Sequence, residues 1–261
     1  MSLTFSHGPL AHRPTAAVNY AIEGPRHRIL FEPHPHRLRA VLGGETVLDT
    51  TDGRLLHESG ILPVLYVPIA DLRQDLLEPT EHTTHCPFKG DASYWSVRVG
   101  DTLAENAVWH YPEPLPEAEW LKGYASIYWD AMDVWLDEEE RVEGHLRDPY
   151  HLVEVRRSSR RVRVLLDDEL IAESDAPAAL FETGLPTRWY LPPTGVRHEL
   201  LRPSETTTVC AYKGTASYFS IELGDRVIED AVWTYPEPLE MALKAGGHLC
   251  FHHDELTVEV D

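Results

Sequence analysis

The chain contains an internal repeat that is free of insertions and deletions. Residues 24–137 return as residues 148–261 at a constant offset of 124 positions. Between 37–137 and 161–261, 39 of 101 paired positions are identical, against roughly one in twenty expected from composition alone. A fixed period defines the unit that folds, and two copies of this length are too few and too large for a solenoid. The repeat therefore predicts a tandem duplication of one small domain.

The repeat divides the chain into four segments. We expect an irregular leader over 1–23, a first β module over 24–137, an acidic linker over 138–147 and a second β module over 148–261. Homologous modules commonly pack about a two-fold axis. We therefore expect the two copies to form an internal pseudo-dimer.

Short alternating segments bounded by glycine and proline predict the secondary structure. Residues 161–166 alternate and then meet Asp167-Asp168, where the first copy has Gly43-Gly44, and both pairs are typical of turns. Further strands are expected at 55–58, 64–67, 81–86, 93–99 and 107–111, and helical turns near 70–73 and 116–121. Many short strands with such turns indicate an all-β protein of two homologous barrel-like or sandwich modules, with short helical turns, rather than a βαβ sheet.

In the strand predicted at 93–99, the residues that differ between the two copies lie on one face, and residues that are identical lie on the other. Trp95, Val97 and Val99 share one face, and their partners Phe219, Ile221 and Leu223 are apolar but different, as a packed core tolerates. The other face carries Tyr94 and Ser96, which return as Tyr218 and Ser220. The retained face therefore suggests a shared groove, or pairing with another strand or with the sister module.

Composition excludes several classes of partner. The net charge is −20, from 43 acidic and 23 basic side chains, and this field repels phosphate backbones and anionic membranes. We expect no nucleic-acid and no membrane partner, although local Lys or Arg could still hold one small anionic ligand. The start of the chain lacks the apolar core of a signal peptide, and three cysteines are too few for a disulfide framework. We therefore expect a cytoplasmic protein.

Two motifs in fixed order resemble a known family. Cys86-x-Phe88-Lys89-Gly90-x-Ala92-Ser93-Tyr94, followed by Ala107-Val108-Trp109-x-Tyr111-Pro112-Glu113-Pro114, is similar to the domain-of-unknown-function 427 family, as are the equivalent motifs of the second copy. The resemblance covers nearly the whole chain and implies a small β-rich domain.

The family is sometimes given a nucleotidyltransferase-like label, which leaves that activity as one alternative. Metal-dependent nucleotidyl transfer needs carboxylates that bridge Mg²⁺ beside a Gly-Ser-type phosphate loop. The chain offers only Gly43-Gly44-Glu45 with Asp49 and Asp52, and the second copy has no glycine there.

Cys86 and Cys210 are the sharpest candidates for catalysis. Lys89 and Lys213 follow them by three residues across a turn, and a nearby ammonium would activate a thiol. The alternative is a small buried residue at the end of a strand. His85 adjoins Cys86, but Val209 replaces it in the second copy, so no histidine beside the thiol is retained. The lysines could instead hold an anionic group.

Retained aromatic residues and one glutamate complete the candidate site. Trp and Tyr two residues apart on a strand share a face and can form a pocket wall, or they can simply seal a small module. Glu58 and Glu182 could act as a general base or a ligand anchor, or could be surface carboxylates at a turn. The predicted ligand-binding residues are Tyr66, Tyr94, Trp109 and Tyr111, with Tyr190, Tyr218, Trp233 and Tyr235.

Neither a metal nor a cofactor is predicted. The chain has 15 histidines, but no Cys-x-x-Cys or His-x-Glu-x-x-His spacing occurs. The sequence favours binding of a small metabolite in a Tyr/Trp-lined groove with Lys and Glu anchors. An enzyme that uses the Cys-Lys pair or the glutamate, and a structural or protein-interaction module, remain the alternatives.

Overall fold

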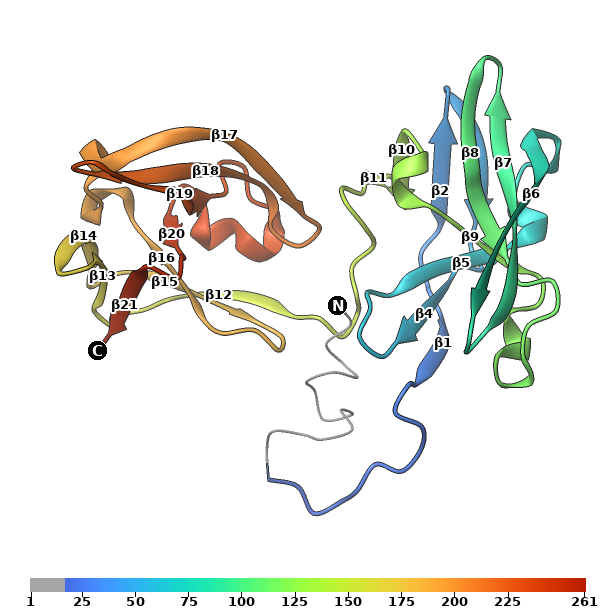
Figure 1. Ribbon diagram of the computed structural model, residues 1–261, viewed down its shortest axis with the longest axis horizontal. Helices are drawn as coiled ribbons and strands as arrows, with labels where there is room; N and C mark the ends of the chain where they lie inside the picture. The colour runs from blue at the N-terminus through green and yellow to red at the C-terminus, as the bar shows by residue number, and fades with distance from the viewer. Residues whose placement is uncertain (1–16) are drawn as a thin grey trace. The chain divides into compact units, whose positions relative to one another are not determined.

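The computed structural model describes residues 17–261, so most of the leader predicted over 1–23 lies outside the described part. The chain divides into two compact units, module 1 up to Asp148 and module 2 over Pro149–Asp261 (Figure 1). Both are built from antiparallel strands and short 3-10 turns, which confirms the all-β prediction. Each is an open two-layer sandwich, and the sheets described do not close into a barrel. Within residues 17–261, no helix is long and apolar enough to cross a membrane.

Module 1 contains a seven-stranded and a four-stranded sheet. The strand order is β1-β4-β5-β9-β8-β7-β6 in the large sheet and β11-β10-β2-β3 in the small one. Figure 1 shows β7 and β8 running side by side as a long hairpin. The elements are β1 (Ile29–Pro33), β2 (Leu38–Leu42), β3 (Glu45–Thr50), β4 (Arg54–Glu58), β5 (Val64–Pro68), η1 (Ile69–Asp71), η2 (Gln74–Leu76), β6 (Leu77–Cys86), β7 (Gly90–Val99), β8 (Thr102–His110), η3 (Pro116–Leu121), β9 (Tyr124–Ile127), η4 (Trp129–Ala131), β10 (Val134–Asp137) and β11 (Glu140–Arg141).

Module 2 repeats this plan with a smaller second sheet. Its large sheet has the order β12-β15-β16-β20-β19-β18-β17, and its small sheet is β14-β13-β21. Figure 1 shows η7 between the curved strands β17 and β18 and strand β12, against which it packs. The elements are β12 (Val153–Arg157), β13 (Val162–Leu166), β14 (Glu169–Ser174), β15 (Ala178–Glu182), β16 (Arg188–Leu191), η5 (Pro193–Gly195), η6 (His198–Leu200), β17 (Leu201–Cys210), β18 (Gly214–Leu223), β19 (Arg226–Thr234), η7 (Glu240–Ala245), β20 (Leu249–Phe251) and β21 (Leu256–Val260).

The large sheet of each module separates two apolar clusters. In module 1, Val97 and Val99 lie in the main core between the two sheets, with half-buried Trp95 packed against it, as the alternation along 93–99 predicts. Tyr94 points to the opposite face, where it is closed inside a second cluster and only 5% exposed. We call this second cluster the tyrosine cluster; its buried members are Leu56, Tyr66, Ala92, Tyr94, Tyr111, Ala118 and Leu121.

A glycine turn joins the two retained motifs of each module. Gly90 and Gly214 have φ of 104° and 98°, which favours glycine. A Cβ at Gly214 would also lie 3.0 Å from the backbone oxygen of Glu237, since the Pro-Glu-Pro segment packs against the turn. The amide of Leu115 donates to the Lys89 carbonyl at 2.9 Å in the first copy. The two motifs are therefore retained together because each fixes the backbone of the other.

A β-bulge explains the retained serine. The β7–β8 register shifts between Trp95 and Val97, and Asn106 on β8 has a φ of 51°. The Asn106 amide donates to Ser96 Oγ at 3.0 Å, and module 2 repeats the contact through Ser220. β-Bulges are specific structural features that are generally kept among related sheets. The bulge therefore explains why the first copy has Ser96 and the second Ser220, and no ligand is needed to account for them.

The last strand of the sandwich is shifted by one residue between the modules. In module 1, β10 places Trp135 opposite Ala40 of β2. In module 2, β21 places Val258 opposite Val164, although the offset of 124 would put Glu259 there. A one-residue slip turns every side chain to the other face. The slip keeps Glu259 out of the core, where it would be costly, and pairs its carboxylate with Arg163 at 2.9 Å.

The acidic segment 138–147 packs onto module 1. Strand β11 pairs with β10, and Leu146 is buried in the main core with Val142 packed against it. The stretch expected to link the modules thus contributes its apolar side chains to the first sandwich.

Candidate functional site

A buried His-Glu-Lys cluster lies beside the tyrosine cluster of module 1. Glu58 ends β4, Lys89 occupies the turn between β6 and β7, and His27 precedes β1. His27 Nε2 lies 3.0 Å from Glu58 Oε1, and Lys89 Nζ donates to Glu58 Oε2. Glu58 is 2% exposed and Lys89 8% exposed. A buried carboxylate is tolerated only when it is paired and hydrogen-bonded, and both of its oxygens are engaged here.

Module 2 builds the same cluster from the equivalent residues. His151 Nε2 lies 3.0 Å from Glu182 Oε1, and Lys213 Nζ donates to Glu182 Oε2 at 2.6 Å. Burial opposes ionisation of Glu182, but the hydrogen bond from His151 and the charge of Lys213 outweigh it and hold the pKa of this carboxyl below its usual value. The repetition of both contacts makes the cluster a property of the repeat unit.

Sequence reasoning singled out the glutamates and lysines but not their histidine partners. It looked for a histidine next to Cys86, where His85 is not retained. The histidine that recurs is His27, which returns as His151 at the same offset of 124. This recurrence lies upstream of the best-matching part of the repeat, and it is the sequence feature from which the histidine could have been predicted.

The predicted ligand-binding aromatics lie behind this cluster. Tyr66 is 1% exposed, and its hydroxyl accepts a hydrogen bond from Trp109 Nε1 at 3.3 Å. Tyr94 Oη lies 2.9 Å from Thr84 Oγ1. Burial is the main cause that raises the pKa of Tyr66 and Tyr111, so both stay neutral.

The equivalent aromatics of module 2 repeat these contacts. Tyr190 accepts from Trp233 Nε1 at 3.0 Å, and Tyr218 Oη lies 2.9 Å from Thr208. Burial likewise raises the pKa of Tyr190 and of Tyr235. In both modules these aromatic side chains form a wall behind the His-Glu-Lys cluster, and hydrogen bonds pair the polar groups described above.

The cysteines sit at the other side of the same turn. Cys86 and Cys210 are half-buried at the ends of β6 and β17 and pack against the aromatic clusters. The ammonium groups that were expected to activate them are engaged by the glutamates instead. Cys250 is fully buried, and burial raises its pKa to about 12.

An open groove in module 1 reaches the histidine of the cluster. The His27 ring stacks on Phe88, with centroids 3.7 Å apart and an interplanar angle of 15°. Arg26 and Arg28 flank His27 along the groove, and Glu117 is the one carboxylate among its lining residues. The groove has a volume of about 1030 Å³, and its other lining residues are Pro25, Ile29, Leu30, Pro87 and Leu115.

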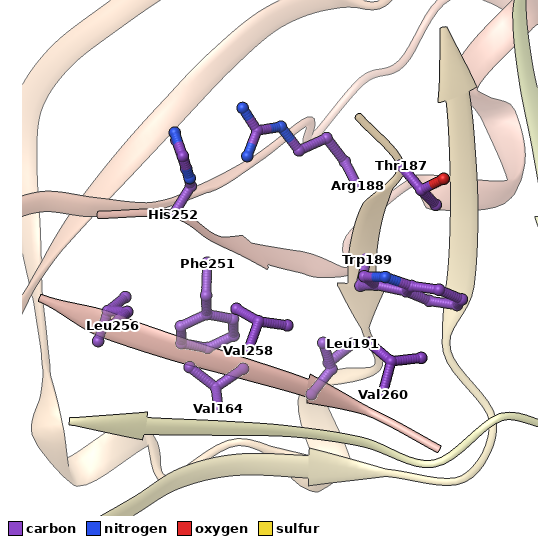
Figure 2. A pocket seen from close by; sticks show the side chains of 10 residues that line it. All are labelled: Val164, Thr187, Arg188, Trp189, Leu191, Phe251, His252, Leu256, Val258 and Val260. Atoms are coloured by element: carbon purple, nitrogen blue, oxygen red, sulfur yellow. The ribbon is translucent and has the colours of Figure 1, made fainter. Parts of the chain in front are cut away.

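Module 2 has a smaller pocket at the slipped strand. Figure 2 shows Val258 and Val260 of β21 beside it, with Arg188 and His252 extending toward one another at one side. Its volume is about 260 Å³. In module 1, Trp135 stacks on Trp129 at 4.2 Å and belongs to the main core. The valines that the slip brings to this face are smaller than Trp135 and remain 39% and 36% exposed, so the space stays open.

The carboxylates that the nucleotidyltransferase label would require are engaged in surface ion pairs. Asp49 pairs with Arg37 and Asp52 with Arg54, at 2.5 and 3.0 Å. The Gly43 amide donates to the Asp133 carboxylate at 2.7 Å instead of facing a phosphate.

Three side chains of module 1 meet in a group suited to a metal, which the sequence reasoning did not predict. His34, His36 and Asp137 each offer one ligand atom, and these atoms lie within 4.8 Å of one another. Burial is the largest cause that lowers the pKa of His34, followed by the neighbouring His36. The His-Pro-His spacing is visible in the sequence, but Asp137 comes from a distant strand.

Fold and site together define a tandem all-β protein in which each module holds one His-Glu-Lys cluster, buried in module 1 and part-buried in module 2. The chain belongs to the family described as domain of unknown function (DUF427), under the label NTP_transf_9, whose model matches residues 30–138 and 154–261. The two matches confirm the resemblance and the duplication. A comparison with curated proteins gave no match.

Proposed function

We propose that this protein binds a small anionic metabolite with a flat ring in the groove of module 1. The observation that carries the proposal is the His27–Phe88 stack, which places an aromatic surface on the groove between two arginines. Flat ligands stack on such surfaces, and a guanidinium pairs readily with a carboxylate. In a chain of net charge −20, a groove lined by two arginines and one glutamate is a local exception that favours an anion.

The buried cluster supports this groove from behind. Glu58 holds the His27 ring in one orientation, and Lys89 neutralises the glutamate. A carboxylate that hydrogen-bonds one ring nitrogen of a histidine orients the ring and raises the basicity of the other nitrogen. Glu58 and Lys89 therefore act as positioning residues, and the Tyr/Trp wall fixes the sheet beneath them.

Thermal melting tests the proposal. The full chain is melted against a library of aromatic carboxylates, because a ligand that binds only the folded state raises stability by about 2.7 kcal/mol at 100 times its Kd. His27→Gln should reduce the shift, whereas the matched change His151→Gln in module 2 should leave it unchanged. A shift that keeps its full size in both His27→Gln and Arg26→Ala would exclude this groove.

Module 2 offers a second position for the same ligand class. Arg188 lies at the pocket of Figure 2, forms no ion pair with a carboxylate within residues 17–261, and faces His252. Its module 1 equivalent is Val64. Arg188→Val should therefore remove any binding that persists in His27→Gln, and Arg202→Ala, at an exposed arginine of the same module, is its control.

The second candidate function is acid-base catalysis. The observation that favours it is the His27–Glu58 pair, which leaves the second ring nitrogen of His27 for a substrate. Incubation of each stabilising compound with the protein, followed by mass spectrometry, separates the two. An unchanged ligand supports binding alone, and a new product that His27→Gln fails to form supports the enzyme.

A further inference from the structure

We propose that module 1 contains a zinc site formed by His34, His36 and Asp137. One ring nitrogen from each histidine and one carboxylate oxygen lie within 4.8 Å of one another. Zinc bonds to nitrogen and oxygen are about 2.1 Å long, so tetrahedral ligand atoms stand about 3.4 Å apart. Small rotations about the side-chain bonds close this difference without any change in the backbone.

The buried histidine has a nitrogen without a partner. His34 is 9% exposed, and its Nε2 has no hydrogen-bond partner among the residues that the structure describes. Buried polar atoms in native proteins are nearly always satisfied, and an exception calls for an explanation such as a bound ion. A zinc ion between His34 and His36 would satisfy this nitrogen.

The backbone holds the three ligands in place. Pro33 and Pro35 flank His34 and restrict its conformations, and the His34 amide donates to the Gly53 carbonyl at 2.8 Å. Asp137 ends β10, where the sheet pairs it with Leu38 at the start of β2. Ligands fixed before binding lose little entropy when the ion arrives.

The charges around the cluster also favour a cation. His36 Nδ1 already lies 2.8 Å from Asp137 Oδ1, and widening this pair by a few tenths of an ångström admits the ion. The two arginines that follow His36 closely in the chain are engaged elsewhere, Arg37 by Asp49 and Arg39 by Glu139. Three glutamates follow Asp137 directly in the chain.

The ligand atoms favour zinc over other metals, and only module 1 has all three of them. Two imidazoles and one carboxylate suit zinc, with water in the fourth position, whereas Ca²⁺ and Mg²⁺ prefer oxygen ligands alone. Module 2 has Ser158 and Arg160 in place of the two histidines. The proposal therefore gives one zinc ion per chain and places it in module 1.

Calorimetric titration of ZnCl₂ into the metal-free full chain, made without a histidine tag, tests the site. One ion should bind per chain, and His36→Gln and Asp137→Asn should each weaken binding at least tenfold, because each removes one of three ligands. Both residues lie near the surface, so the variants should keep the wild-type melting temperature in the metal-free state. His82→Gln, at an exposed histidine of the same module, should bind as the wild type does.

A cobalt titration supplies a second readout. Co²⁺ in the same site should give the intense visible absorption of a tetrahedral centre, and both ligand variants should lose it. The absence of saturable zinc binding would overturn the proposal. Wild-type affinity in both His36→Gln and Asp137→Asn would overturn it equally.

Discussion

Lys213 Nζ lies 2.6 Å from Glu182 Oε2, and the lysine and glutamate at the equivalent positions of module 1 form the same buried ion pair. Lys213 was expected to serve Cys210, three residues earlier. Its ammonium instead crosses to β15, where burial makes an unpaired carboxylate costly. The lysine of the retained motif is therefore part of a charge cluster that is present in both modules.

The first prediction concerns this pair. Lys213→Met leaves the mostly buried Glu182 with His151 as its partner, so we expect the full chain to lose about 3 kcal/mol in urea unfolding of module 2. The double variant Lys213→Met with Glu182→Gln should lose clearly less than the sum of the two single changes, because no unpaired charge remains. Additive losses would show that the two groups do not interact.

The second prediction is a pH dependence. The pKa of Glu182 is lowered in the folded state, so its ionised form stabilises the fold above its unfolded value of about 4.3. That contribution is lost as the pH falls through the lowered value. The stability advantage of the wild type over Glu182→Gln should thus be constant from about pH 5 to pH 7 and shrink below about pH 4. An advantage that grows on acidification would contradict this sign.

The third prediction concerns the thiols. Cys86 and Cys210 are half-buried, whereas Cys250 is fully buried with its pKa raised to about 12. Only the thiolate reacts, so iodoacetamide at neutral pH should label the first two cysteines well before the third. Peptide mass spectrometry over time measures the order. Labelling of all three at the rate of global unfolding would make Cys86 and Cys210 purely structural.

The fourth prediction tests the slipped strand. Val258→Trp, combined with Val164→Ala, copies the Ala40–Trp135 pairing of module 1 and should fill the pocket of Figure 2, with a gain of about 1 kcal/mol. Glu259→Trp is the control, since Glu259 aligns with Trp135 in the repeat but points outward. A gain from Glu259→Trp together with a loss from the double variant would contradict the one-residue shift.

Sequence reasoning predicted the local structure well, since it depends on alternation and turn residues. The strand at 93–99 and the helical turn at 116–121 form where alternation and Pro116 indicate them. The shifted register of β21 was hidden, because an alignment without gaps implies identical pairing. Only the cost of burying Glu259 reveals the difference.

The candidate site was predicted residue by residue but not as an arrangement. Glu58 and Lys89 were both singled out, yet Glu58 ends β4 and Lys89 lies in the turn that precedes β7, and β5, β9 and β8 separate these two strands in the sheet. Only the curvature of the whole sheet brings them together, and no local pattern encodes it. His27 was missed because it precedes the strongest part of the repeat. The aromatic residues were expected at a groove, and the structure closes Tyr66 and Tyr94 behind it.

The most direct test of the account is a titration followed at the histidine rings. Benzoate, a flat anion, is added to ¹⁵N-labelled protein while the ring nitrogen signals are recorded. We predict that the His27 signals move to saturation, that those of His151 stay in place, and that Arg26→Ala weakens the response. If benzoate and related aromatic carboxylates leave His27 unmoved, or shift His151 equally, the groove of module 1 is not an anion-binding site.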